Sequence, residues 1–247
     1  MQDRQRSQGR IPALDLARSA ALVGMIVYHA VYDLTLFGFL APGTAHQTIW
    51  LLFARLVAGS FLFVAGMSLH LAHGQGIQWN KFFRRIVILI VAAAAITVAT
   101  YYLQRPSYVF FGILHSIAAA SVIGLAFLRL PPLFTIAVAA FALVAPQFMR
   151  SEAFDAPYLL WLGLSSERPS SMDFEPIFPW LGPFLLGLAC SKLFLKAGIW
   201  DALRRGTRDW GRGLGILVWP GRHSLGIYLI HQPVLFGVLY AAARFLR

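Results

Sequence analysis

Long apolar blocks, separated by short polar connections, dominate this chain of 247 residues. A helix of about 20 apolar residues crosses the hydrocarbon core of a membrane, which is roughly 30 Å thick. The chain is 58% hydrophobic and only 13% charged, whereas soluble domains carry about 25% charged residues. This pattern predicts an all-α fold, a polytopic integral membrane bundle of about seven transmembrane helices that forms one domain over residues 1–247. The approximate limits are 12–39, 47–72, 82–103, 108–128, 132–148, 176–197 and 222–244.

The net charge of +11 is distributed as in a membrane protein rather than as in a nucleic-acid-binding protein, because lysines and arginines lie mostly between or beside the apolar blocks. By the positive-inside rule, the basic connections are cytoplasmic. The amino terminus is therefore predicted to be cytoplasmic, and the acidic connection between the fifth and sixth spans extracytoplasmic. The basic residues that indicate this orientation are Arg4, Arg6, Arg10, Lys81, Arg84, Arg85, Arg129, Lys192, Lys196, Arg204, Arg205, Arg208, Arg212 and Arg222.

Two segments need separate interpretation. Residues 200–219 combine arginines with Trp200, Trp210 and Trp219, a mixture typical of a segment that lies on the cytoplasmic interface. An eighth span there would be short. The first apolar block is interrupted by Asp15 and Arg18 and has no small-residue cleavage site after it, so we expect a retained span rather than a signal peptide.

Four ionisable residues share one face of the predicted first helix. At about 100° per residue, His29 lies about 20° from Arg18 around the helix axis, and Asp15 and Asp33 each lie about 60° from it. Arg18 and His29 are roughly 16 Å apart along the axis, with His29 toward the outer side. Ionisable residues inside a span face the protein interior or a wet cavity and mark functional paths. The face is therefore a candidate site.

His29 has the chemistry of a general base, because an imidazole titrates near neutral pH. Asp33 follows one turn later, where a carboxylate can fix the tautomer of the ring and stabilise the imidazolium. Two structural alternatives stay open. Asp15 and Arg18 also suit a salt-bridged helix start, and His29 also suits a hydrogen-bonded packing histidine.

Further polar residues are predicted at matching depth on the outer side. Arg55 and His115 lie roughly 10–12 Å inside the outer ends of their helices by helical rise. Asp173 and Glu175 precede a span with three prolines, "DFEPIFPWLGPFLLG", which predicts a kinked or broken helix. Arg55 also suits a structural ion pair with one of these carboxylates, and Asp173 and Glu175 also suit a solvated loop.

On the cytoplasmic side, Arg84 and Arg85 lie near the sequence "GRHSLGIYLIHQP" in the predicted topology. The residues Arg222 and His223 open that last span, and helix amino termini favour phosphates. Contact with lipid headgroups is the alternative for Arg84 and Arg85. His231 lies about 15 Å into the span. No metal site is predicted, because the histidines lack ligand spacing with a carboxylate on the same face, and Cys190, the single cysteine, excludes a cysteine-based zinc site.

Four blocks of the sequence resemble a known family. "DLARSAALVGMIVYHAVYDL", "FGILHSIA", "DFEPIFPWLGPFLLG" and "GRHSLGIYLIHQPVL" are similar, in the same order, to the heparan-alpha-glucosaminide N-acetyltransferase catalytic-domain family in its short bacterial form. The spacing from Arg18 to His29 also resembles the signature of the acyltransferase-3 family, which belongs to the same transmembrane acyltransferase superfamily. Ser19 stands where both families usually have glycine, and we expect this difference to change packing rather than chemistry.

The resemblance implies an enzyme of the cell inner membrane that transfers an acyl group, typically acetyl, from cytoplasmic acyl-CoA to a sugar amine or hydroxyl outside. It suggests catalytic roles for His29, Asp33 and His115. It suggests donor binding by Arg18, Arg84, Arg85, Arg222, His223 and His231. It suggests acceptor binding by Arg55, Asp173 and Glu175. The alternative function is a proton-coupled transporter or flippase that uses the same polar face. A membrane scaffold or binding protein is a third hypothesis. Homo-oligomerisation is left open.

Overall fold

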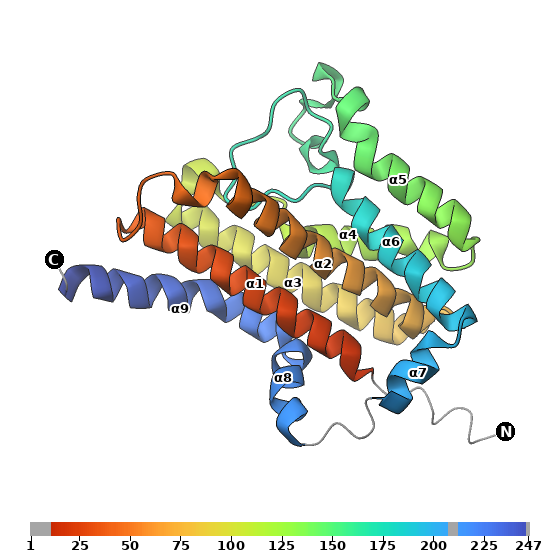
Figure 1. Ribbon diagram of the computed structural model, residues 1–247. Coiled ribbons are helices and arrows are strands. Elements are labelled where there is room, and N and C mark those ends of the chain that lie inside the picture. The colour runs from red at the N-terminus through yellow and green to blue at the C-terminus, as the bar shows by residue number, and fades with distance from the viewer. Residues whose placement is uncertain (1–10, 207–211, 246–247) are drawn as a thin grey trace. The chain divides into compact units, whose positions relative to one another are not determined.

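The computed structural model describes residues 11–206 and 212–245, and these residues form an all-helical fold (Figure 1). The α-helices are α1 (Pro12–Leu36), α2 (Thr48–His73), α3 (Trp79–Leu103), α4 (Ile113–Phe127), α5 (Pro132–Met149), α6 (Ile177–Lys196), α7 (Ile199–Gly206), α8 (Arg212–Arg222) and α9 (Ser224–Phe245). The described residues contain no β-strand beyond an isolated bridge between Phe111 and Phe174. The predicted fold class is confirmed.

Six helices are long and apolar enough to cross a membrane, namely α1, α2, α3, α5, α6 and α9. Their outward faces carry large apolar side chains, such as those of Val87, Ile90 and Val91 on α3. In water such a surface would be costly, whereas lipid tails solvate it at no penalty. Multiple membrane-spanning helices therefore account for both the length of the apolar blocks and the exposure of their side chains.

The fourth predicted helix, 108–128, was wrong at its start. Residues 108–112 are not helical, and Phe111 pairs with the segment before α6, since the amide of Glu175 donates to its carbonyl. Helix α4 then begins at Ile113 and has 15 residues, or about 22 Å by helical rise. It is shorter than the hydrocarbon core, and it is held at both ends by polar side chains described below.

Contacts divide the chain into two compact units, residues 1–61 with 194–247 and residues 62–193. Within the first unit, α1 contacts both α8 and α9 (Figure 1). The contact with α8 is close, because a Cβ on Gly221 would overlap the carbonyl oxygen of Asp15. The polar face of α1 is thus covered by α8 and α9, as expected for ionisable residues inside a span.

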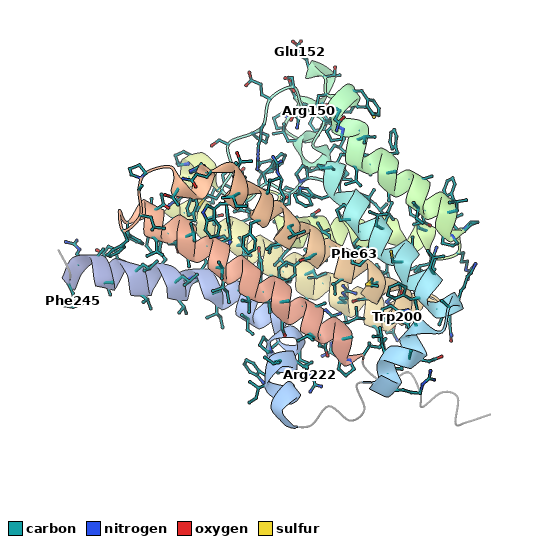
Figure 2. All side chains as sticks on the ribbon, viewed as in Figure 1. Phe63, Arg150, Glu152, Trp200, Arg222 and Phe245 are labelled. Carbon is teal, nitrogen blue, oxygen red and sulfur yellow. The ribbon has the colours of Figure 1, made fainter. Side chains whose placement is uncertain are left out.

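Within the second unit, α6 is the most buried of the candidate spans. Phe184, Leu185 and Leu188 have no exposed surface, and a Cβ on Gly187 would overlap the carbonyl oxygen of Phe63, which is labelled in Figure 2. The predicted interruption of this span is confirmed: Phe178 departs from helical geometry with φ of −99° and ψ of 126°, and Pro183 lies further along the helix.

The predicted interfacial segment 200–219 contains most of α7 and part of α8. Residues 207–211, including Arg208 and Trp210, lie outside the described residues, as do Arg4, Arg6 and Arg10. Helix α8 has 11 residues and is too short to span a bilayer. It ends at Arg222, and α9 covers Ser224–Phe245, close to the approximate limits of 222–244 that the sequence predicts. Arg222 belongs to the end of one helix rather than to the beginning of the next.

Candidate functional site

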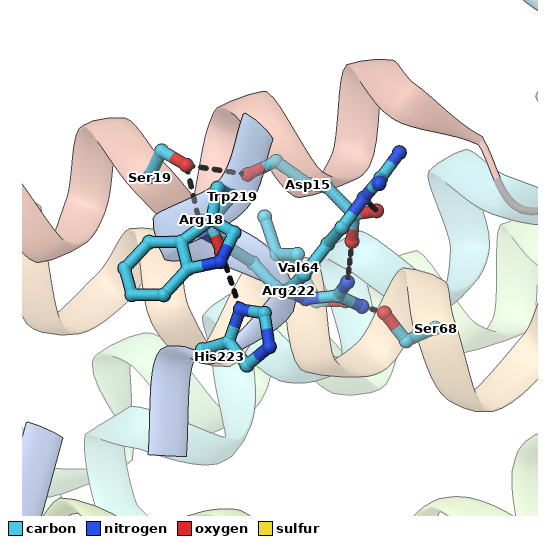
Figure 3. A network of polar contacts seen from close by, with 9 residues as sticks. Asp15, Arg18, Ser19, Val64, Ser68, Trp219, Arg222 and His223 are labelled. Atoms are coloured by element: carbon cyan, nitrogen blue, oxygen red, sulfur yellow. Dashed lines mark hydrogen bonds and ion pairs between the residues drawn. The ribbon is translucent and has the colours of Figure 1, made fainter. Parts of the chain in front are cut away.

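The end of the polar face that was predicted to be cytoplasmic carries an ionic network between α1 and α8 (Figure 3). Asp15 is fully buried, and its Oδ1 accepts a hydrogen bond of 2.6 Å from Nη1 of Arg18. Its Oδ2 lies 3.6 Å from Nε of Arg222. The salt-bridged helix start that the sequence left open is therefore present, and Arg222 extends it. Two guanidinium groups share one carboxylate, so the network carries a net positive charge.

Ser19 joins the same two helices. Its hydroxyl donates to the carbonyl of Asp15 over 3.1 Å and accepts from the amide of Gly221 over 2.8 Å (Figure 3). The buried amide of Gly221 thus has a side-chain partner on α1 that a glycine at position 19 would not provide. His223, beyond Arg222, is exposed, and its Nδ1 lies 3.0 Å from the carbonyl oxygen of Trp219.

A histidine pair lies further along α1, where it meets α9. The ring centroids of His29 and His231 are 4.9 Å apart, with an angle of 60° between the rings. Nδ1 of His231 lies 2.6 Å from the carbonyl oxygen of Tyr228. Because a carbonyl only accepts, this nitrogen carries a proton, and Nε2 of the neutral ring is an acceptor. That Nε2 is buried and has no hydrogen-bond partner among the described residues.

Asp33 lies one turn beyond His29 and is 1% exposed. Both of its carboxylate oxygens accept from Nε2 of Gln232, over 3.0 and 3.1 Å. Among the described residues no hydrogen bond joins Asp33 to His29. The carboxylate therefore fixes Gln232, the neighbour of His231, and so connects α1 to α9 beside the histidine pair. Oε1 of Gln232 is a second buried acceptor with no partner in the described part of the chain.

In the second unit, His115 and Asp173 hold the start of α4. Nδ1 of His115 accepts from the amide of Gly112 over 3.2 Å. Nε2 of the neutral ring then carries the proton, and it faces Oγ1 of Thr97 at 3.4 Å. Oδ2 of Asp173 accepts from the amide of Ile113 over 3.1 Å. Two amides that a helix start leaves without partners are thereby satisfied.

Burial raises the pKa of Asp173 to about 6, a rise that the hydrogen bond from Ile113 and the nearby Arg168 oppose. Asp173 is half-buried and precedes α6, so the solvated-loop alternative does not describe it. Glu175 is also half-buried, and the pairing of its backbone with Phe111 fixes it in the same segment. Asp173 and Glu175 lie at the end of the connection from α5 to α6. Arg150 and Glu152, labelled in Figure 2, lie at its start, where α5 ends.

The opposite end of the second unit contains a cavity of about 590 Å³ at the turn between α2 and α3. Its polar lining residues are His73, Gln75 and Arg129. Lys81 and Arg85 interact electrostatically with His73, whereas Arg84 is exposed on α3. Residues 34–151 contain no aspartate or glutamate, so no carboxylate of this segment offsets these cations.

The sequence predicts that Lys192 lies in a basic connection, but the structure places it inside α6. It is 7% exposed, and its Nζ donates to the carbonyls of Phe127 and Leu130 over 2.5 and 2.7 Å. Phe127 is the last residue of α4 and Leu130 lies in the turn after it, and the carbonyl end of a helix favours a cation. Lys192 is therefore a structural cap and does not report membrane orientation.

The predicted residues fall into two groups. The first unit contains Arg18, His29, Asp33, Arg55, Arg222, His223 and His231. The second contains Arg84, Arg85, His115, Asp173 and Glu175. Of the first group, only Arg55 stands apart: it is exposed on α2 and forms no ion pair with the described carboxylates of its own unit. No three His, Cys, Asp or Glu residues in the described part of the chain are grouped so as to hold a metal ion.

Two features of the site were missed from the sequence. The contact between His29 and His231 and the pairing of Asp33 with Gln232 join residues about 200 positions apart. Their only sequence signal is that polar residues at 231 and 232 interrupt an apolar run, in a block that also carries the family resemblance.

Comparison with known proteins identifies the family. No curated protein and no solved structure matches the chain. The sequence model of the family described as heparan-alpha-glucosaminide N-acetyltransferase, catalytic, matches residues 10–233. This range includes both histidines of the pair, the Asp15 network and the caps of α4. The chain therefore belongs to this family of membrane acetyltransferases.

Proposed function

We propose that this chain transfers an acetyl group from cytoplasmic acyl-CoA to a sugar amine or hydroxyl on the extracytoplasmic side, with His29 as the general base. The observation that carries the proposal is the pair of His29 and His231 on the covered polar face of α1. It lies within the range matched by the acetyltransferase family model. A neutral imidazole in this position accepts the proton that an amine or hydroxyl loses as it attacks the thioester.

The remaining roles follow from charge and position. Arg18 and Arg222, which share the single carboxylate of Asp15, supply positive charge for the phosphates of the donor. His223, Arg84 and Arg85 serve the same purpose, and the cavity at the α2–α3 turn adds Arg129. Asp33 holds α9 against α1 through Gln232, which keeps His231 beside His29.

For the acceptor, we assign Arg55, Asp173 and Glu175 to binding a sugar on the outer side. His115 is assigned to the stabilisation of the developing oxyanion. Its ring already serves the start of α4, so this role requires the proton on Nε2 to turn from Thr97 toward the substrate.

The proposal is tested by reconstituting the purified chain in liposomes with acetyl-CoA on the side of the basic connections and glucosamine on the other side. We expect acetylated glucosamine on the acceptor side and free CoA on the donor side, in equal amounts. Liposomes that contain His29→Ala protein are the matched control. Passage of either compound across the bilayer without covalent change would support a transporter and would overturn the acetyltransferase proposal.

A further inference from the structure

The roles proposed for the reaction leave the buried Nε2 of His231 without a function, although buried polar atoms without partners are rare and call for an explanation. The atom lies on the histidine whose ring meets His29. The other nitrogen of the ring is fixed as a donor by the carbonyl of Tyr228. The tautomer is thus set so that the free lone pair belongs to Nε2.

The fixed ring has little freedom to turn away. Tyr228 lies on the preceding turn of α9, with its ring centroid 5.6 Å from that of His231. Gln232, the next residue, is attached to both carboxylate oxygens of Asp33. The carboxylate holds α9 in register with α1, and the carbonyl of Tyr228 holds the orientation of the ring.

From this geometry we infer that His231 is the proton partner of His29, a positioning residue whose Nε2 shares the proton that His29 removes from the acceptor. The inference rests on the proposed acetyl transfer. It differs from the role in donor binding that the sequence suggested for His231, because a buried acceptor beside the base suits a proton rather than a phosphate.

The proton balance of the reaction is complete without another reactant. The acceptor nitrogen bonds to the thioester carbon, and its N–H proton passes to His29. His29 shares this proton with Nε2 of His231 while the charge develops. The C–S bond then breaks, and the proton returns through His29 to the sulfur. One N–H and one C–S bond are lost, and one C–N and one S–H bond are formed.

Two amide substitutions separate this role from a purely structural one. In His231→Asn, the amide nitrogen takes the place of Nδ1 and is able to donate to the carbonyl of Tyr228, but there is no basic atom. In His231→Gln, the amide lies near the place of Nε2 and also has no basic atom. His46→Asn is the matched control, because His46 is an exposed histidine of the same unit whose ring contacts Tyr32.

The experiment measures acetyl transfer from acetyl-CoA to glucosamine by the purified full-length chain, from pH 5.5 to 9. We expect kcat to fall about 10- to 100-fold in both His231 variants, below the usual range of about 100- to 10,000-fold for a group that takes the proton directly, because His231 acts through His29. The KM for acetyl-CoA should change less than about twofold. The pH profile of kcat should lose one ionisation, and His46→Asn should match the wild type. Added imidazole should restore part of kcat to His231→Ala.

Wild-type kcat in His231→Asn would overturn the inference, because a donor to Tyr228 would then be sufficient. A raised KM with unchanged kcat would also overturn it, in favour of donor binding. Thermal unfolding of each variant identifies one that fails to fold, and the imidazole response of His231→Ala then decides. Absence of turnover in the wild type would refute the proposed function itself, a result distinct from either of these.

Discussion

His231 and His115 both interrupt apolar helices, yet their ring nitrogens have different partners. Both nitrogens of His115 are occupied, one by the amide of Gly112 and the other by Thr97. His231 has one nitrogen fixed by Tyr228 and the other buried without a partner beside His29. A histidine with both ring nitrogens bonded stabilises the fold without an unsatisfied buried group. A buried acceptor without a partner lowers the free energy of unfolding, and such an atom calls for a functional explanation.

The largest expected effect comes from disturbing the close contact between α1 and α8. In Gly221→Ala, the new Cβ would overlap the carbonyl of Asp15, so α8 has to move away from α1. We expect a loss of about 3 kcal/mol in the free energy of unfolding, at the upper end for overpacking. Thermal unfolding in detergent measures it. Gly226→Ala, where the Cβ would meet no atom within 4 Å, is the control and should be far less affected.

A smaller effect is expected from removing the donor to Asp33. In Gln232→Leu, the buried carboxylate loses its only hydrogen bonds within the described residues, which costs about 2 kcal/mol for a charged acceptor. The double variant Asp33→Leu with Gln232→Leu should recover much of that loss, because no buried polar group is left without a partner. Additive losses in this double-mutant cycle would contradict the pairing.

His115→Ala tests whether a histidine with both ring nitrogens bonded also acts in catalysis, for comparison with the pair of His29 and His231. Loss of the bond to Gly112 at the start of α4 should cost about 1 kcal/mol of stability, as for other helix caps. Acetyl transfer should fall at least about 100-fold, as expected when a donor to the developing oxyanion is removed. A decrease of less than about tenfold, with the protein folded, would contradict a role in catalysis and leave His115 only its bond at the start of α4.

The smallest effect concerns Asp173. Since its pKa is raised to about 6 in the folded chain, the folded state holds its proton more tightly than the unfolded state, and stability falls as the pH rises from about 4 to 6. Asp173→Asn keeps an acceptor for Ile113 but does not ionise. Above pH 6 we expect the variant to be more stable than the wild type by about 1 kcal/mol, because the half-buried group is partly screened by water. Unfolding curves at pH 4 and pH 7 test this, and an equal difference at both would contradict it.

Much of the fold follows from local patterns in the sequence. Hydropathy located all six long spans, and the prolines after Asp173 predicted the interruption of α6. Helical spacing placed Arg18, His29 and Asp33 on one face of α1, and that face is covered by α8 and α9. These features depend on residues that are close in the chain, so a period of 3.6 residues is enough to detect them.

The partners of that face were not predictable in the same way. Gln232 reaches Asp33 across 199 positions, and no periodicity specifies which of several polar residues will meet. Lys192 was predicted to lie in a connection because its charge is near the end of a span. In the structure its Nζ donates to the carbonyl of Phe127 at the end of α4. The start of α4 was misjudged because His115 and Asp173 begin the helix at Ile113, and such capping depends on a segment 60 positions away.

The central claim is that His29 performs the chemistry of acetyl transfer rather than holding the donor. It is tested most directly by measuring acetyl-CoA binding by calorimetry and the release of free thiol in the presence of glucosamine, for the wild type and His29→Ala. We predict that both proteins bind acetyl-CoA with dissociation constants within about twofold of each other. We also predict that thiol release falls at least about 100-fold in the variant, as expected for the loss of a general base. Thiol release at the wild-type rate in His29→Ala, or no binding of acetyl-CoA by either protein, would contradict the claim.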